Sequence, residues 1–114
     1  MIKFDLTEDL KKQFQEEGFL ILENFLDDQF IPQLTEKFPK LFSGDFETGI
    51  EPDEWNWKQG RDPENVTRQI CNAWKADNSI KDLVCHEVLG KACAELMNWS
   101  GSTLLQDNVL WKPP

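Results

Sequence analysis

The chain has 114 residues, 39% of them hydrophobic, with eight Phe and five Trp, so it can build one domain with a modest core and is not expected to be disordered. Its formal charge of −9 disfavours nucleic acid and anionic membranes as partners, because both repel an acidic protein. No apolar run approaches the ~20 residues of a membrane span, and the N-terminus has no secretory-signal pattern, so we expect a soluble, cytoplasmic protein.

The first predicted element is a helix over about residues 7–17. Asp5 or Thr7 can cap its start, an apolar residue recurs every four positions, and Gly18 can supply a left-handed stop. Residues 19–25 follow as a short apolar run, long enough for a buried strand and too short for another helix. The opening of the chain therefore predicts a helix, a glycine turn and a strand.

A second helix and a long loop are predicted next. Asp27 and Asp28 can open the helix, with Pro32 tolerated in its first turn. Pro39 is expected to end this helix or to begin one further short turn. Residues 43–60 then predict a long surface loop, because glycines and a proline stand there among acidic residues.

Two tryptophans in the predicted loop, Trp55 and Trp57, allow two interpretations. They could pack over a neighbouring site, or they could hold the loop against the core. The same loop carries the acids Glu51, Asp53 and Glu54. We expect these acids to be solvated rather than to form a metal site, because no histidine lies near them in the sequence.

The rest of the chain predicts helices and a final strand. Residues 62–77 predict a helix, because an aspartate followed by a proline is a typical helix start. Residues 78–99 predict the next helix, capped by Asn78 or Ser79, and residues 103–114 predict a strand. This order of helices and strands predicts an α+β fold. The three cysteines form no C-x-x-C pair and are expected to be reduced thiols in helices: Cys71, Cys85 and Cys93.

Two segments of the chain resemble the phytanoyl-CoA dioxygenase-like family. One is residues 18–26, G-F-L-I-L-E-N-F-L, which follows a helix and leads through an acidic turn into a second helix. The other is residues 105–114, which contain the pattern Q-D-x-x-x-x-K-P-P. The resemblance covers essentially all of this chain but only the front of a family member. It implies that residues 1–114 are the N-terminal part of one domain: helices plus the first strands of an incomplete double-stranded β-helix, or jelly roll.

The resemblance also implies a chemistry for the parent enzyme. Members of the family bind Fe(II) and 2-oxoglutarate, and we expect the parent to hydroxylate a small organic substrate. Two histidines and one carboxylate hold the iron in such enzymes, and in the family an H-x-D pair follows shortly after the K-P-P segment. This chain lacks that pair, and its single histidine, His86, is expected to have an ordinary surface role. We therefore expect the chain alone to have no catalytic or metal-binding residues, to bind neither cofactor and to be inactive.

The final strand supplies the candidate cofactor-binding residues. Side chains alternate along a strand, so Gln106, Asn108, Leu110 and Lys112 share one face. By the resemblance, Gln106 and Asn108 would donate and accept hydrogen bonds near the cosubstrate, and Lys112 would face a carboxylate. The alternative interpretation is that this face is simply exposed to solvent on an edge strand.

A second function stays open at this point. The chain could be a complete, non-catalytic α+β module that binds a partner through its acidic surface and through the loop with Trp55 and Trp57. If the chain is instead a fragment of an oxygenase, its few strands leave unpaired edges, which favour self-association.

Overall fold

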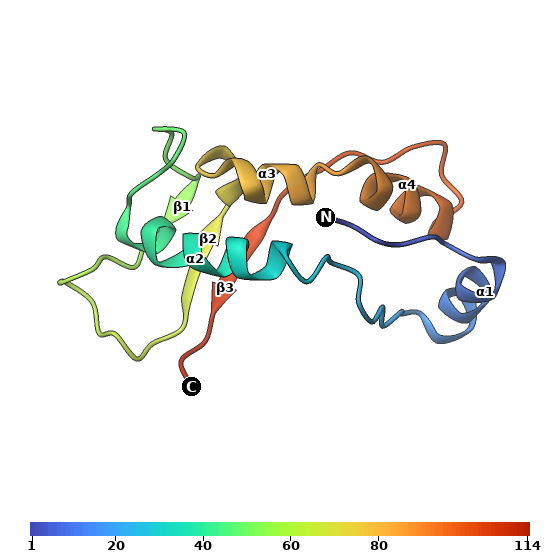
Figure 1. The fold of residues 1–114 in the computed structure, drawn as a ribbon, viewed down its shortest axis with the longest axis horizontal. Coiled ribbons are helices and arrows are strands. Elements are labelled where there is room, and N and C mark those ends of the chain that lie inside the picture. Colours follow the sequence, from blue (N-terminus) through green and yellow to red (C-terminus); the bar gives the residue numbers. More distant parts are fainter.

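The computed structural model describes residues 1–114 and contains both helices and strands (Figure 1). This mixture confirms the predicted α+β class. The three strands form a single antiparallel sheet, whereas a jelly roll consists of two sheets with about eight strands. The elements in chain order are α1 (Glu8–Glu17), α2 (Phe30–Ser43), β1 (Glu54–Trp55), β2 (Arg68–Cys71), the 3₁₀ helix η1 (Ala73–Lys75), α3 (Asn78–Val84), α4 (Glu87–Leu96) and β3 (Asn108–Trp111).

The sheet has the order β1-β2-β3, with β2 in the centre. Ile70 of β2 lies opposite Val109 of β3, and both side chains belong to the face that packs against α2 and α3. Gln69 lies opposite Leu110 on the other face of the sheet, together with Asn108. We call this second face the open face, because its residues Gln69, Asn108 and Leu110 are exposed, although Cys71 on the same face is buried.

The core lies between α2, α3 and the covered face of the sheet. Its centre is Ile70, whose exposed fraction is 0%. Only 14 of the 114 residues are buried, so the core is small for the number of large apolar side chains present. The buried members of the cluster are Leu41, Phe42, Trp57, Ile70, Ala73, Ala76 and Ile80.

The molecule is elongated. Its radius of gyration is 16.2 Å, compared with about 13 Å for a compact chain of similar length. The sheet and α2 lie toward one end of the molecule, and α1 and α4 pack together at the other (Figure 1). An ion pair of 3.2 Å between Lys11 and Glu95 joins α1 to α4. None of the helices combines the length and the apolar character that a membrane crossing requires.

Helix α1 confirms the first prediction. The Oγ1 of Thr7 accepts a hydrogen bond from the backbone N–H of Leu10, and Gly18 ends the helix with a φ of 81°. These signals lie within the helix itself or beside it, so the sequence alone was sufficient to find them.

The predicted strand over residues 19–25 is wrong. The segment has no strand partner, and Ile21 is 78% exposed. One isolated bridge, between Ile2 and Leu26, forms directly after the segment, and Asn24 turns the backbone within it with a φ of 54°. An apolar run becomes a strand only where a neighbouring strand can pair with it, and the sheet of this protein lies elsewhere.

Pro39 does not end the second helix, which continues to Ser43. The proline removes one helical hydrogen bond, but residue 35, whose carbonyl loses that bond, is exposed and can be hydrated. Gly44 ends the helix instead, with a φ of 86°. The prediction of a second helix with Pro32 in its first turn is confirmed, but the helix begins at Phe30 after Gln29, and neither Asp27 nor Asp28 is its N-cap.

The predicted helix over residues 62–77 is also wrong, because the segment contains β2 and η1 instead. A strand forms here because β2 pairs on both sides, with β1 and with β3. Asn72, with a φ of 57°, then turns the chain into η1. Pairing with distant residues therefore overrides the local helix signal.

The predicted helix over residues 78–99 is divided in two. Asp77, rather than Asn78 or Ser79, caps α3, and the chain breaks at Cys85 before α4 begins. All three cysteines are free thiols, but only Cys93 lies in a helix, because Cys71 lies in β2 and Cys85 lies in the turn between α3 and α4. The final strand is shorter than predicted and covers only Asn108–Trp111.

Candidate functional site

Asp107 determines where β3 begins. Its carboxylate accepts hydrogen bonds from the backbone N–H groups of Ala73 at 3.2 Å and Trp74 at 3.1 Å, and so caps the start of η1. The backbone O of Asp107 accepts from the N–H of Asn72 at 2.9 Å, and its own N–H donates to the Oδ1 of Asn72 at 3.2 Å. Burial raises the pKa of Asp107, although the two backbone hydrogen bonds act in the opposite direction. Four hydrogen bonds thus hold the beginning of β3 against η1.

Arg68 holds the end of β3 against the core. Its guanidinium lies over two indoles, 3.6 Å from the ring centre of Trp57 and 4.4 Å from that of Trp111. The same group donates to the backbone O of Glu64 at 2.7 Å and pairs with its carboxylate at 2.9 Å, while Nε is buried without a partner. We call Trp57, Arg68 and Trp111 the Trp–Arg–Trp stack. It joins the loop before β2, the strand β2 and the strand β3.

The candidate cofactor-binding residues all lie at the surface. Gln106, Asn108 and Lys112 are exposed, and of the three only Asn108 lies within β3. The Oδ1 of Asn108 accepts a hydrogen bond of 2.8 Å from the Nε2 of Gln69 across the sheet. Leu110 lies opposite Gln69 on the open face and is 59% exposed. The structure therefore brings Asn108 and Leu110 onto one face, as predicted, on a strand that is the edge of the sheet.

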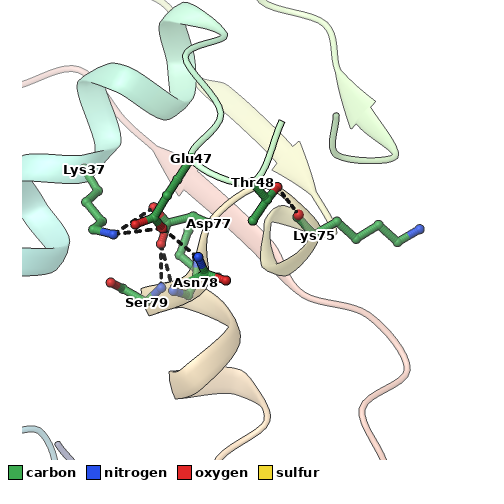
Figure 2. Close-up of polar contacts among 8 residues, drawn as sticks. Lys37, Glu47, Thr48, Lys75, Asp77, Asn78 and Ser79 are labelled. Atoms are coloured by element: carbon green, nitrogen blue, oxygen red, sulfur yellow. Dashed lines mark hydrogen bonds and ion pairs between the residues drawn. The ribbon is translucent and has the colours of Figure 1, made fainter. Parts of the chain in front are cut away.

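A charged cluster outside the predicted site joins α2, the loop after it and α3 (Figure 2). The Nζ of Lys37 lies 3.1 Å from a carboxylate oxygen of Glu47 and 3.4 Å from one of Asp77. That oxygen of Glu47 also accepts from the backbone N–H of Asn78 at 3.0 Å. The backbone hydrogen bond from Asn78, followed by the contact with Lys37, lowers the pKa of Glu47. We call Lys37, Glu47 and Asp77 the lysine–acid cluster.

The lysine–acid cluster borders a cavity of about 220 Å³, whose further charged neighbours are Lys40 and Asp45. Asp77 is almost completely buried, and its second oxygen accepts from the N–H groups of Ser79 and Ile80 at 2.8 and 3.0 Å. Every charged group of the cluster thus already has a partner within the protein. Its arrangement explains how the loop after α2 is held against α3 and does not itself indicate a ligand.

The two loop tryptophans hold the loop against the core, which was one of the two interpretations. Trp57 is buried, and its Nε1 donates to the backbone O of Pro63 at 2.9 Å. Trp55 donates to the backbone O of Phe42 at 3.1 Å and meets the ring of Phe46 edge-on at 5.0 Å. The loop over residues 43–60 is therefore a fixed part of the structure around β1.

The acids of this loop are partly engaged. Asp53 accepts a hydrogen bond of 2.6 Å from the Nδ2 of Asn72 and pairs with Lys75 at 2.6 Å. No three His, Cys, Asp or Glu side chains come together in a group that could hold a metal ion. The histidine has a structural role that sequence reasoning missed: the Nδ1 of His86 accepts from the N–H of Val88 at 3.2 Å and caps α4. Its position directly before Glu87 at a helix start was the available signal.

The chain was compared with protein-family models, with curated proteins and with solved structures. None of them shows a significant match.

Proposed function

We propose that this chain forms the helical cover and the first strands of an Fe(II)- and 2-oxoglutarate-dependent oxygenase similar to phytanoyl-CoA dioxygenase. The parent enzyme would hydroxylate a small organic substrate. One observation carries the proposal: helices pack on one face of a small antiparallel sheet, and the other face is left open with Gln69, Asn108 and Leu110 exposed. In a jelly roll two sheets lie face to face, so the open face is where the second sheet would pack.

The residues of this chain do not fit an iron centre by themselves. Such a centre needs two histidines and one carboxylate on one side of the metal. His86 is the only histidine, and its Nδ1 is occupied in capping α4. In the proposal the iron ligands come from residues outside this chain, and no reaction step is assigned to the residues within it.

A cation for a 2-oxoglutarate carboxylate lies next to the open face, at the end of β3, and the exposed acid of that face, Glu54, lies two strands away on β1. Lys112 is exposed directly after β3, Asn108 offers an amide group on the open face, and Gln106 is exposed just before the strand. The carboxylate of Asp107 does not oppose an anion there, because it turns toward η1 and accepts two backbone hydrogen bonds. We assign cosubstrate contacts to Gln106, Asn108 and Lys112 on this basis.

The test measures succinate formed from 2-oxoglutarate in the presence of Fe(II) and oxygen. The 114-residue chain and the product of its complete reading frame are assayed side by side. We expect succinate from the complete product and none from the chain. Succinate from the chain would contradict the assignment of the iron ligands to other residues, and its absence from both samples would overturn the proposal.

A pair of lysine variants tests the assigned contacts in the same assay. Lys112→Ala in the complete product should raise the KM for 2-oxoglutarate by roughly tenfold or more, because it removes a charged hydrogen-bond donor. Lys81→Ala is the matched control, since Lys81 is exposed on α3 and has no ion-pair partner. An equal effect of both variants would show that only general charge is involved.

A second candidate function is a non-catalytic interaction module. The observation in its favour is the number of large apolar side chains at the surface, including Phe19, Trp99 and Leu105. The partner surface would consist of these residues and not of Trp57, which is buried. A monomeric 114-residue protein that unfolds cooperatively, together with a reading frame that lacks an H-x-D motif, would favour the module over the oxygenase.

A further inference from the structure

The two edges of the sheet differ in length and charge. The β1 edge has two residues, one of them Glu54, and Asp53 stands directly before it. Charged residues on a short edge strand discourage further pairing. The β3 edge is twice as long, and its residues Asn108–Trp111 contain no charge, with Lys112 following them. In a chain of net charge −9, this is an edge that another acidic molecule could approach without meeting an exposed acid.

The pairing of β3 with β2 determines which backbone groups remain free. The N–H of Asn72 donates to the O of Asp107, and these two residues are opposite each other when the β2–β3 register is continued by one position. Hydrogen-bonded and non-bonded pairs alternate in an antiparallel ladder. Residues 109 and 111 therefore bond to β2, and the N–H and C=O groups of Asn108, Leu110 and Lys112 point away from the sheet.

We propose that β3 pairs antiparallel with β3 of a second copy of this chain, around a two-fold axis at Leu110. This inference does not rest on the proposed function. The free groups are self-complementary in this register: Leu110 pairs with Leu110 of the second copy, and Asn108 pairs with Lys112 of the second copy. The two sheets join into one of six strands, since each copy contributes three.

The side chains agree with this register. The exposed Leu110 residues meet on the open face and bury each other. On the covered face, Val109 lies opposite Trp111 of the second copy, and aromatic side chains paired with β-branched ones are favourable across strands. Lys112 meets the amide of Asn108 of the second copy, so no pair of like charges stands opposite across the axis.

The size of the contact sets its strength. Pairing extends over about five residues, because Pro114 lacks the N–H that would continue the outward ladder. An interface of this length is smaller than the ~800 Å² per partner of a stable complex. The dimer should therefore be weak and should form in a concentration-dependent way.

Sedimentation equilibrium over a concentration series tests the proposal with the 114-residue chain. We expect the wild type to shift from monomer toward dimer, and Leu110→Lys to weaken association by about tenfold or more, because two ammonium groups would then face each other at the axis. Leu105→Lys is the matched control, since Leu105 is 94% exposed and lies outside β3. A wild type that stays monomeric at every concentration would overturn the proposal, and so would a control that weakens association as much as Leu110→Lys.

Cysteine cross-linking tests the register without relying on a destabilising charge. In a background with Cys85→Ser and Cys93→Ser, which removes the exposed thiols, Leu110→Cys should form a disulfide-linked dimer under mild oxidation. Residues directly opposite in a hydrogen-bonded pair have Cα atoms about 5.5 Å apart, within disulfide range. Asn108→Cys should not link to itself, since the two positions would be roughly 14 Å apart. Equal cross-linking of both variants would contradict the two-fold axis at Leu110.

Discussion

At the scale of single residues, Arg68 and Asp107 hold the two ends of β3. The side chain of Arg68 contacts the loop before β2, the core and the last strand together. A guanidinium over two indoles gains from contact with both rings and from the burial of its apolar stem. The unpartnered Nε is the cost of this arrangement, and the contacts with Glu64 offset part of it.

Loss of the Trp–Arg–Trp stack should destabilise the fold. We expect Arg68→Ala to lower the free energy of unfolding by about 2 kcal/mol, because both cation–π contacts and the packing of the stem are lost. Urea unfolding followed by tryptophan fluorescence measures this change. Arg61→Ala is the control, since Arg61 is 62% exposed and its loss should cost less than about 0.5 kcal/mol. Equal losses would mean that stacking contributes little.

Carboxyl groups with shifted pKa values determine the response to acid. The pKa of Glu47 lies below its ordinary value, so ionised Glu47 stabilises the fold at neutral pH, and this contribution is lost as the pH falls. Asp107 affects stability in the opposite direction. Burial raises its pKa, so ionised Asp107 lowers the stability of the fold at neutral pH, and protonation at lower pH removes this effect. Asp27, Asp53 and Asp62 have lowered values and act like Glu47.

The urea midpoint should therefore fall as the pH drops below 4.5, the ordinary pKa of glutamate. Glu47→Gln should make this fall shallower, because it removes one group that loses stabilisation in acid. Asp107→Asn should make it steeper, because it removes the group that acts in the opposite direction. The comparison uses the slope against pH and not the absolute midpoint, since both variants also change hydrogen bonds. Slopes identical to that of the wild type would contradict the assigned directions.

At the scale of elements, the end of α2 and the loop after it depend on each other. Gly44 ends α2 in the left-handed region, with a φ of 86°, and the indole of Trp55 packs directly over its Cα. A side chain at this position would meet both backbone strain and the ring. The lysine–acid cluster then holds the same loop against α3.

Gly44→Ala should cost about 2 kcal/mol or more, because the new methyl group would run into the indole of Trp55. Gly49→Ala is the matched control, with a similar φ of 72° but no atoms near the new methyl group, so it reports backbone strain alone at about 1 kcal/mol. Thermal or urea unfolding of both variants gives the comparison. A Gly49→Ala variant as unstable as Gly44→Ala would rule out the contact with Trp55 as the cause.

Elements with local signals could be predicted from the sequence, and elements that depend on distant partners could not. The capping of α1 by Thr7 and its end at Gly18 are contained in neighbouring residues. The local sequence around β2 predicts a helix. The strand forms because it pairs with distant residues: Gln69 of β2, for example, donates a side-chain hydrogen bond to Asn108, 39 positions further along the chain. The shared face of Asn108 and Leu110 followed from alternation, whereas the Trp–Arg–Trp stack required knowledge of how β2 and β3 pair.

At the scale of the whole molecule, the elongated shape and the uncovered apolar side chains belong together. Few residues are buried, and large apolar groups such as Leu110 and Phe19 lie in solvent. A sheet with one covered and one open face buries the side chains of only one of its two faces. We propose that a second sheet covers the open face in the parent oxygenase. In the 114-residue chain, we propose that a second copy pairs with the β3 edge.

The coding sequence directly after Lys112, Pro113 and Pro114 tests the oxygenase proposal most directly. We expect the natural reading frame to continue and to encode an H-x-D motif shortly after this segment, with a second histidine much later. A reading frame that stops here, or that continues without such a motif, would contradict the assignment of this chain to an Fe(II)- and 2-oxoglutarate-dependent oxygenase.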